Sequence, residues 1–173
     1  MNYKRRYRTV LKSTVYTLIT VVAVAVLVAT LWLPVLQIYG SSMSPTLQDG
    51  EIFFSVNTSD MKQGDIVAFY YNNKILVKRV IAGPGDWVDI TEDGTVYVNQ
   101  ILLDELFLAE KALGECDIEL PYQVPDGKLF VMGDHRSTSV DSRSSLIGCV
   151  AEEQIVGKII FRIWPLDRLG GFQ

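Results

Sequence analysis

The sequence predicts a mostly β protein, in which an antiparallel β-sheet domain follows one N-terminal transmembrane helix. Two observations support this fold class. An apolar run lies near the N-terminus, and the remainder holds short β-branched and aromatic runs between Gly, Pro and Asn turns. We therefore expect a basic segment over residues 1–12, a membrane-spanning helix over 13–36 and a β-domain over 37–173, which suits a chain of 173 residues.

The apolar run is long enough to cross a bilayer. Residues 13–48 include no charged side chain, and residues 15–36 are almost wholly apolar. A membrane-spanning helix needs about 20 such residues, whereas a cleavable secretory signal has an apolar core of about 7–15. The pattern Ala23-Val24-Ala25 resembles a signal cleavage site, but it lies inside the run. A permanent anchor in the lipid bilayer is therefore the prediction.

The charges on either side of the run predict its orientation. Five basic residues precede it, and the first charged residues after it are Asp49 and Glu51. Positively charged flanks stay on the cytoplasmic side, so we expect the N-terminus inside and the β-domain outside the cell membrane. The net charge of −4 and the position of the basic cluster beside the span argue against a nucleic-acid-binding surface.

Strands are predicted beyond the anchor from runs rich in β-branched and aromatic residues. Asn72-Asn73 separates two of these runs, and Glu92-Asp93-Gly94 separates another two, as turns of hairpins do. The segment 103–113 has helical character and ends at Gly114, although an extended loop fits it equally well. The predicted strands are 51–56, 65–71, 74–82, 86–91, 95–99, 128–132, 147–151 and 155–164.

The two cysteines, Cys116 and Cys149, give no evidence of a disulfide from their spacing alone. The simpler expectation is a buried thiol at Cys149 and an incidental one at Cys116. A single histidine and the lack of a close cysteine pair argue against a metal site. We expect neither a metal nor another cofactor.

Three serines follow the anchor directly. Ser41, Ser42 and Ser44 lie within residues 40–46, whose sequence is Gly-Ser-Ser-Met-Ser-Pro-Thr. A serine hydroxyl is a poor nucleophile until a base takes its proton. Small residues around it leave backbone N–H groups free to stabilise an oxyanion. Composition alone favours a polar linker with a proline turn, so the nucleophile needs further support.

Two side chains compete for the role of base. His135 is the single histidine, and a Ser-His-Asp triad would use it with Asp134 or Asp141. Lys78 lies in the predicted strand 74–82, where alternation places it on an apolar face. Burial disfavours the charged form of lysine, and a fall of about 2 units from a pKa of about 10.4 makes it a base near pH 8.

A third cluster, residues 133–143, mixes acidic and basic side chains. Asp134, Arg136, Asp141 and Arg143 are so close in sequence that ion pairs bracing a turn are the expectation. Two carboxylates without a metal-ligand pattern give little reason to propose a glycosidase.

At these residues the sequence resembles type I signal peptidases, the Ser-Lys proteases that remove signal peptides from secreted proteins. The resemblance rests on three elements that follow an anchor in order. They are residues 40–47 (GSSMSPTL), residues 78–81 (KRVI) with Pro84-Gly85-Asp86, and residues 133–143 (GDHRSTSVDSR). The first element alone also fits self-cleaving repressors, which lack the anchor and the third element.

The resemblance implies an antiparallel catalytic β-domain of the signal-peptidase type, together with roles for individual residues. It implies that Ser42 is the nucleophile and Lys78 the general base. It also implies that Ser139 positions the lysine amine and that Asp141 and Arg143 support the site. The expected function is that of a membrane-bound serine endopeptidase that cleaves N-terminal signal peptides from exported preproteins.

The sequence departs from the family pattern at two positions near the expected site. Gly40 stands where some members carry a serine whose hydroxyl stabilises the oxyanion. The Ser42 N–H therefore needs a helper, which we expect from the region of Gly40 or Ser41. His135 stands where asparagine is usual. The short stretch 100–126 is similar to that of compact Gram-positive-type members.

Two alternative functions remain compatible with the sequence. A protease of the same Ser-Lys class would act on a specific regulator instead of on preproteins in general. A non-catalytic, membrane-tethered β-domain would bind a partner and would not require Ser42 and Lys78 to meet.

Overall fold

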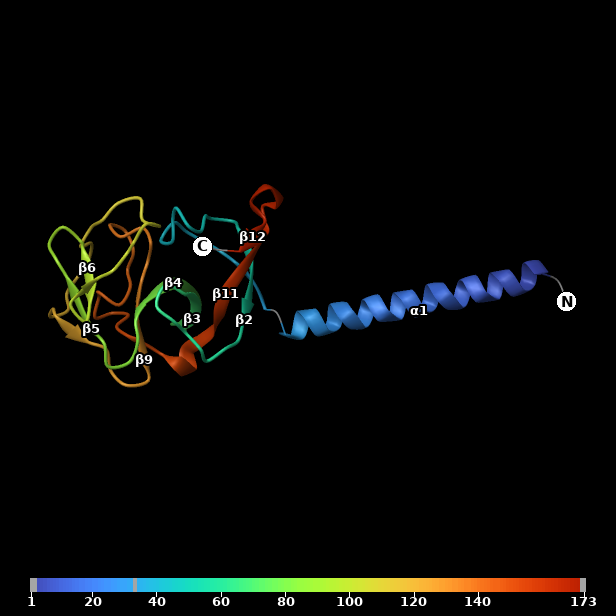
Figure 1. Ribbon diagram of the computed structural model, residues 1–173, viewed down its shortest axis with the longest axis horizontal. Coiled ribbons are helices and arrows are strands. Elements are labelled where there is room, and N and C mark those ends of the chain that lie inside the picture. The colour runs from blue at the N-terminus through green and yellow to red at the C-terminus, as the bar shows by residue number, and fades with distance from the viewer. Residues whose placement is uncertain (1–2, 33, 172–173) are drawn as a thin grey trace. The chain divides into compact units, whose positions relative to one another are not determined.

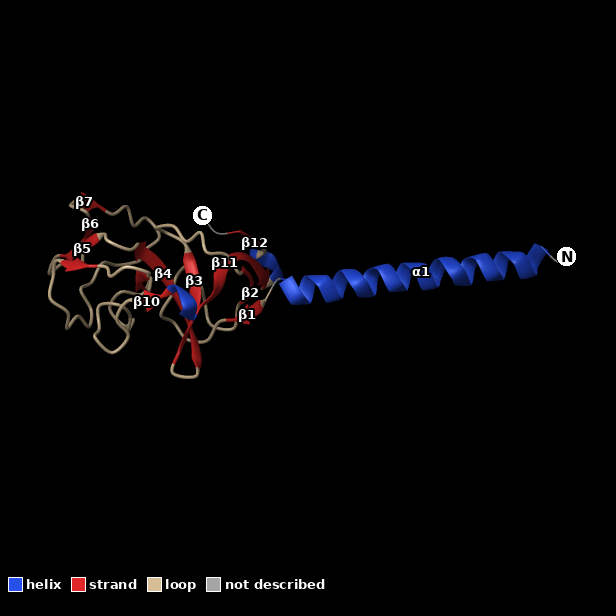
Figure 2. Cartoon of the chain, turned by 90° about the horizontal axis from the view of Figure 1, so that it is seen from below, coloured by secondary structure: helices blue, strands red, loops and turns tan. Residues whose placement is uncertain are grey.

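The computed structural model describes residues 3–32 and 34–171, and it divides the chain into two compact units. The first contains helix α1 (Tyr3–Trp32), and the second is a β-domain that begins at Val35 (Figure 1). Outside α1, the described residues form strands, loops and turns, with two one-turn 3₁₀ helices at Glu152–Gln154 and Leu166–Arg168 (Figure 2). The mostly β fold class is confirmed.

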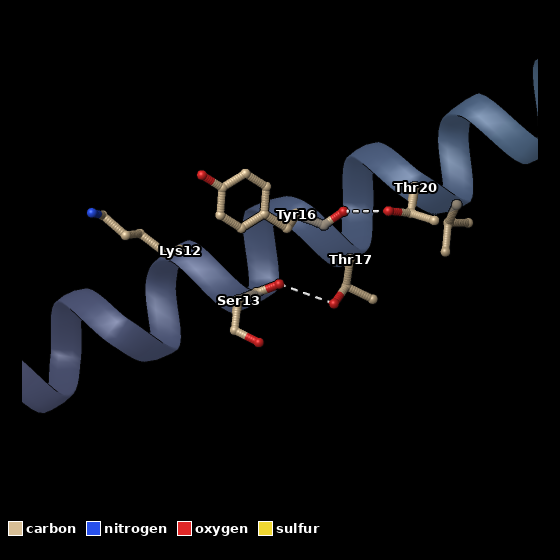
Figure 3. Close-up of a pocket in the computed structure, with 6 residues that line it drawn as sticks. Lys12, Ser13, Tyr16, Thr17 and Thr20 are labelled. Carbon is tan, nitrogen blue, oxygen red and sulfur yellow. Dashed lines mark hydrogen bonds between the residues drawn. The ribbon is translucent and has the colours of Figure 1, made fainter.

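Helix α1 holds one segment, Val10–Leu27, that is long and apolar enough to cross a membrane. The threonine hydroxyls within it bond to the helix itself. Thr17 and Thr20 each donate to the carbonyl oxygen four residues earlier, at 2.9 Å (Figure 3). A bilayer offers no water to pair polar groups, so bonds of this kind let the hydroxyls be buried in lipid at little cost.

The β-domain consists of two sheets in which every recorded strand pair is antiparallel. The larger sheet has the order β1-β2-β11-β3-β4-β9-β10, with β12 also paired to β11, and the smaller has the order β7-β6-β5-β8. The strands are β1 (Val35–Gln37), β2 (Ile52–Val56), β3 (Ile66–Tyr71), β4 (Lys74–Ala82), β5 (Trp87–Ile90), β6 (Val96–Val98), β7 (Ile101–Leu102), β8 (Tyr122–Gln123), β9 (Lys128–Met132), β10 (Val150–Ala151), β11 (Ile155–Trp164) and β12 (Gly170–Gly171).

Helix α1 differs at both ends from the range 13–36 predicted for the helix. Helix α1 begins at Tyr3, so most of the basic segment is helical, and it ends at Trp32. Residues 35 and 36 belong to β1, which pairs with β2. Pro34 accounts for this boundary, because proline lacks the N–H that a helix interior requires.

The hairpin of β3 and β4 sets the position of Lys78. Tyr71 and Lys74 close a two-residue turn, Asn72–Asn73, whose φ angles are 43° and 61°. Positive φ at both central residues is what a type I′ hairpin turn needs, and asparagine tolerates it. The register that follows places Lys78 opposite Val67.

Strand β4 changes its pairing partner along its length. It pairs with β3 from Lys74 to Arg79 and with β9 from Arg79 to Ala82, so the two ladders overlap at Arg79. Residues 74–78 pair with β3 alone among the described strands, because β9 ends at Met132, opposite Arg79. The edge of β4 beside Lys78 is therefore open just beyond the end of β9.

Three apolar clusters hold the domain together. One lies under the smaller sheet and includes Ile81, Val88 and Phe130. A second contains Met43, Leu47 and Phe53, so it fixes the turn that follows Ser42. The third contains Val67, Val80 and Val131, with Leu76 packed against it. The apolar face predicted for Lys78 is this third cluster, to which its cross-strand partner Val67 belongs.

The remaining differences from the sequence prediction concern short or irregular segments. Segment 103–113 is an extended loop with turns and contains no helix. The predicted strand 147–151 is reduced to β10, and the two-residue strands β7, β8 and β12 had no distinct signal. Strands this short depend on their partners, so local sequence does not reveal them.

Candidate active site

Lys78 is almost fully buried, with 3% of its surface exposed. Burial lowers the pKa of its amine from 10.5 to about 8, because the charged form loses its water. The nearby carboxylates of Asp141 and Asp134 oppose this shift, and the positive charge of Arg143 adds to it. A substantial share of the amine is therefore neutral near pH 8 and able to accept a proton.

Asp141 and Arg143 form a buried ion pair in the segment that follows β9. Both side chains are fully buried, and Arg143 donates from Nε to Oδ1 at 2.8 Å and from Nη2 to Oδ2 at 2.9 Å. The same carboxylate accepts the Gly133 N–H at 2.9 Å. Arg143 Nη2 also donates to the Ser139 carbonyl oxygen at 3.2 Å. The pair thus fixes both ends of the segment 133–143.

Gly133 is the point at which the other predicted site residues converge. It directly follows Met132, the partner of Arg79, so the register places it beside Lys78. A Cβ at Gly133 would lie 2.5 Å from the Ser42 carbonyl oxygen and would collide with Ser139 Oγ. Only glycine leaves room for so close an approach. Ser139 Oγ is buried and has no recorded hydrogen-bond partner.

Ser42 lies half-buried in the turn between β1 and the buried residue Met43. Its carbonyl oxygen accepts the N–H of His135 at 3.0 Å, which joins this turn to the segment after β9. The Gly40 N–H donates to Asp49 Oδ1 at 2.7 Å, so it is already engaged. Among the described residues, the N–H groups of Ser41 and Ser42 have no recorded acceptor. These two groups can stabilise an oxyanion.

The structure brings Ser42, Lys78, Ser139 and the Asp141 carboxylate to one turn, although they come from three separate segments. For the described residues, the recorded hydrogen bonds include none between the Ser42 hydroxyl and the Lys78 amine. Hydrogen bonds between catalytic groups are often long before a substrate binds.

His135 is not arranged as the base of a triad. Asp134, its first expected partner, is held by Arg79 through two hydrogen bonds of 2.9 and 2.6 Å. Asp141, the second, is held by Arg143. His135 Nδ1 is buried without a recorded partner, and Nε2 lies 3.9 Å from a carboxylate oxygen of Glu110. Neither aspartate orients the imidazole toward Ser42.

Two of the four charged residues in the third cluster find their partners outside it. Asp134 pairs with Arg79 on β4, whose guanidinium lies 3.8 Å from the ring centre of Phe107. Arg136 pairs with Glu105, and both side chains are buried. Sequence reasoning missed Glu105 and Phe107. Their only signal was a pair of acidic residues, Asp104 and Glu105, between leucines in a segment with helical character.

Side chains of the segment 133–143 hold the loop 103–113 at both of its ends. Glu105 binds Arg136, and Arg136 Nε donates to the Gly133 carbonyl oxygen at 3.0 Å. At the other end, Arg143 Nη1 donates to the Leu113 carbonyl oxygen at 2.5 Å. These contacts attach the segment to the domain at Glu105 and at Leu113, and it forms a loop.

The cysteines take no part in this arrangement. Cys116 and Cys149 are both free and half-buried. Burial raises the pKa of the Cys149 thiol, which makes it a weaker nucleophile. Within the described residues, no group of three or more His, Cys, Asp and Glu side chains is placed to hold a metal ion.

Comparison with known proteins gives a consistent result. The family model described as signal peptidase, peptidase S26, matches residues 11–164. The chain is 39% identical to signal peptidase IB of Staphylococcus aureus over 150 residues, covering 75% of this chain and 77% of the relative. It is also 39% identical to signal peptidase I T of Bacillus subtilis over 143 residues, covering 75% and 73%.

A solved structure is similar to the β-domain fold described above. The crystal structure of a signal peptidase I from Enterococcus faecalis matches with a TM-score of 0.51 and 29% sequence identity. The match covers 59% of this chain and 98% of that one.

Proposed function

Because the chain belongs to the signal peptidase family S26, whose members cleave signal peptides from preproteins, we propose that Ser42 is its nucleophile and Lys78 its general base. The chain is accordingly a serine peptidase. The observation that carries the proposal is the burial of Lys78, which lowers the pKa of its amine to about 8. A neutral amine beside the turn that holds Ser42 is the base that a serine nucleophile requires.

The substrate binds as an extended strand along the open edge of β4. Residues 74–78 lack a partner on that side among the described strands, and β9 already occupies the same position further along. Main-chain hydrogen bonds would hold the segment before the scissile bond in register, and alternate side chains would enter shallow pockets. The family resemblance implies small residues at the first and third positions before the cut.

The reaction follows the usual two steps of a serine peptidase. Neutral Lys78 takes the proton of the Ser42 hydroxyl, whose oxygen attacks the carbonyl carbon of the scissile bond. The ammonium then gives its proton to the departing amine, which leaves an acyl group on Ser42. Lys78, neutral again, takes a proton from water, and the resulting hydroxide attacks the acyl carbon. The bond between that carbon and the Ser42 oxygen then breaks, and the ammonium of Lys78 returns its proton to the Ser42 oxygen.

The oxyanion formed in each step is stabilised by the N–H groups of Ser42 and Ser41. Both lack a recorded acceptor in the described part of the chain, whereas the Gly40 N–H is bound to Asp49. Removing one donor of an oxyanion hole typically lowers kcat by about 10²–10³. In this chain the two backbone N–H groups would supply the donors, in place of the serine hydroxyl that some family members carry at the position of Gly40.

Ser139, Asp141 and Arg143 act on Lys78 without transferring a proton. The buried Ser139 hydroxyl, which has no recorded partner, is available to accept a hydrogen bond from the amine. The Asp141–Arg143 pair holds the segment that carries Ser139. Its two charges have opposite effects on the pKa of Lys78, so burial remains the main cause of the shift.

The experiment that tests this proposal compares alanine variants of the full chain on a panel of preproteins. Ser42→Ala and Lys78→Ala should each abolish cleavage while the circular dichroism spectrum stays unchanged. Ser41→Ala is the matched control, because it removes an exposed neighbouring hydroxyl and keeps the backbone N–H. Full activity of a folded Lys78→Ala chain would contradict the proposal. Cleavage by His135→Asn should persist, and its complete loss would favour a histidine base.

The apolar helix α1 fits a membrane anchor. We infer that its basic end lies in the cytoplasm and that the β-domain lies on the outer face of the cell membrane, where exported preproteins emerge. A cysteine placed at the exposed turn residue Glu92, in a chain whose own cysteines are replaced by serine, tests this orientation. A membrane-impermeant maleimide should label it in intact cells. Labelling only after lysis would show that the β-domain lies inside the cell and would contradict the inferred orientation.

A further inference from the structure

A pocket lies beside the turn that carries the candidate nucleophile. Its lining comes from the residues just after Ser42, from the segment after β9 and from the loop 103–113. The lining residues are Ser44, Pro45, Ala109, Glu110, Asp134 and His135. The hydrogen bond of 3.0 Å from the His135 N–H to the Ser42 carbonyl oxygen attaches this pocket to the nucleophile. None of the lining residues belongs to β4.

The two carboxylates of the pocket differ in their surroundings. Asp134 has no exposed side-chain surface and is neutralised by Arg79 at 2.6 Å. Glu110 has 56% of its side chain exposed, and it accepts a hydrogen bond of 2.6 Å from the Ser137 hydroxyl at Oε1. Glu110 is therefore an oriented carboxylate that faces solvent at the mouth of the pocket.

The cationic side chains near Glu110 do not pair closely with it, so its negative charge remains available to attract a substrate. Lys111, the adjacent cation, donates to Thr95 Oγ1 at 3.3 Å. His135 Nε2 lies 3.9 Å from Oε1 of Glu110. In the described part of the chain, Oε2 of Glu110 has no recorded partner.

We propose that this pocket binds the part of the preprotein that follows the scissile bond, and that Glu110 favours a basic side chain there. The inference rests on the proposed function, because it takes Ser42 as the attacking residue and the β4 edge as the site of the preceding segment. The chain beyond the cut must then leave the β4 edge and pass the turn of Ser42. At this point an oriented carboxylate attracts lysine or arginine and repels aspartate or glutamate.

The test uses the full chain in detergent micelles and three peptides that differ only in the residue after the scissile bond, which is Lys, Gln or Glu. The quantity measured is the ratio of kcat/KM for the Lys peptide to that for the Glu peptide. Exposed charge pairs are weak, so we expect a ratio of about fivefold at low salt. The ratio should fall toward one in high salt, because the pair is screened.

Glu110→Gln should reduce the ratio to below about twofold, and Glu110→Lys should invert it. Glu92→Gln is the matched control, because it removes the same charge from an exposed turn outside the pocket and should keep the wild-type ratio. Ser137→Ala, which removes the hydrogen bond that orients the carboxylate, should give an intermediate ratio.

The outcomes separate this inference from the proposed function. Cleavage of all three peptides at equal rates, or a ratio that is the same in wild type and Glu110→Gln, would overturn the subsite alone. Failure of the wild-type chain to cleave any peptide would overturn the proposed function and the subsite with it.

Discussion

At the scale of single residues, the surroundings of Lys78 lower the pKa of its amine and so make it able to accept a proton. Its amine is buried beside an apolar cluster and feels the charges of Asp141, Asp134 and Arg143. Burial lowers the pKa of the amine from 10.5 to about 8, whereas Arg79, its neighbour on β4, forms an ion pair with Asp134. On the proposed assignment, adjacent positions of one strand thus serve proton transfer and structural support.

The pKa of Lys78 predicts how activity depends on pH. With a value of about 8, roughly a tenth of the amine is neutral at pH 7 and about nine-tenths at pH 9. The kcat/KM for preprotein cleavage should therefore rise with pH and reach half its maximum near pH 8. Initial rates between pH 6 and 10 measure this. A half-maximum near pH 6.5 would indicate a histidine base instead.

Burying a charged lysine also lowers stability. Lys78→Met should abolish cleavage and raise the free energy of unfolding at pH 7 by about 1–3 kcal/mol, because an apolar side chain of similar length replaces a buried charge. Between pH 8 and 10.5 the unfolded wild-type lysine binds a proton that the folded one releases, so wild-type stability rises with pH. The extra free energy of unfolding of the Met variant, relative to wild type, is therefore largest below pH 8 and disappears above pH 10.5.

Urea unfolding of both chains at pH 7 and at pH 10 measures this difference. A Met variant that is less stable than wild type at pH 7 would show that Lys78 supports the fold in its charged form, which contradicts its role as a buried base.

At the scale of elements, the turn after β9 positions the site. Gly133 lies so close to the Ser42 carbonyl oxygen and to Ser139 that no side chain fits there. Gly133→Ala should lower kcat/KM at least tenfold and destabilise the domain by about 1–3 kcal/mol, because the added methyl group pushes these segments apart. Gly83→Ala is the control, since its Cβ would meet only an ordinary contact of 3.6 Å. Equal activity of the two variants would refute this close approach.

Elements specified by local sequence were predicted well. The runs 74–82, 128–132 and 155–164 agree with the bounds of β4, β9 and β11, and Asn72-Asn73 forms the expected hairpin turn. Interactions between distant segments were not predictable in this way. The partner of Arg136 is Glu105, far away in sequence, and this contact draws the loop 103–113 out of the helix that its composition allows.

The candidate site was predictable to a similar extent. Strand alternation and burial made Lys78 a feasible base, but physical reasoning alone could not choose Ser42 over its neighbours. That choice came from the family resemblance. The engagement of the Gly40 N–H by Asp49 and the two uncommitted N–H groups after it depend on the turn geometry, for which the sequence carried no signal.

At the scale of the whole molecule, the boundary between helix and β-domain lies before β1. A chain that lacks residues 1–32 keeps β1 and should fold. A chain that lacks residues 1–37 exposes the edge of β2 and should be less stable by about 1–2 kcal/mol, because it loses the strand hydrogen bonds and the half-buried Leu36. Urea midpoints compare the two, and identical midpoints would contradict the boundary.

The sheet as a whole assembles the site from three segments that local sequence does not connect. Ser42 follows β1, Lys78 lies in β4, and Ser139 and Asp141 follow β9. Antiparallel pairing of β4 with β9 brings the second and third together, and the hydrogen bond from His135 to Ser42 adds the first. On the proposed assignment, catalysis therefore depends on the sheet that holds these three segments together.

The most direct test of the Ser42 and Lys78 assignment is to locate the acyl group during turnover. A preprotein cleavage reaction is quenched rapidly with acid, and peptide mass spectrometry identifies the acylated residue. The account predicts an acyl group on Ser42 in the wild-type chain and none in a folded Lys78→Met chain. An acyl group on Ser41 or Ser44, or acylation of the Met variant at the wild-type rate, would contradict it.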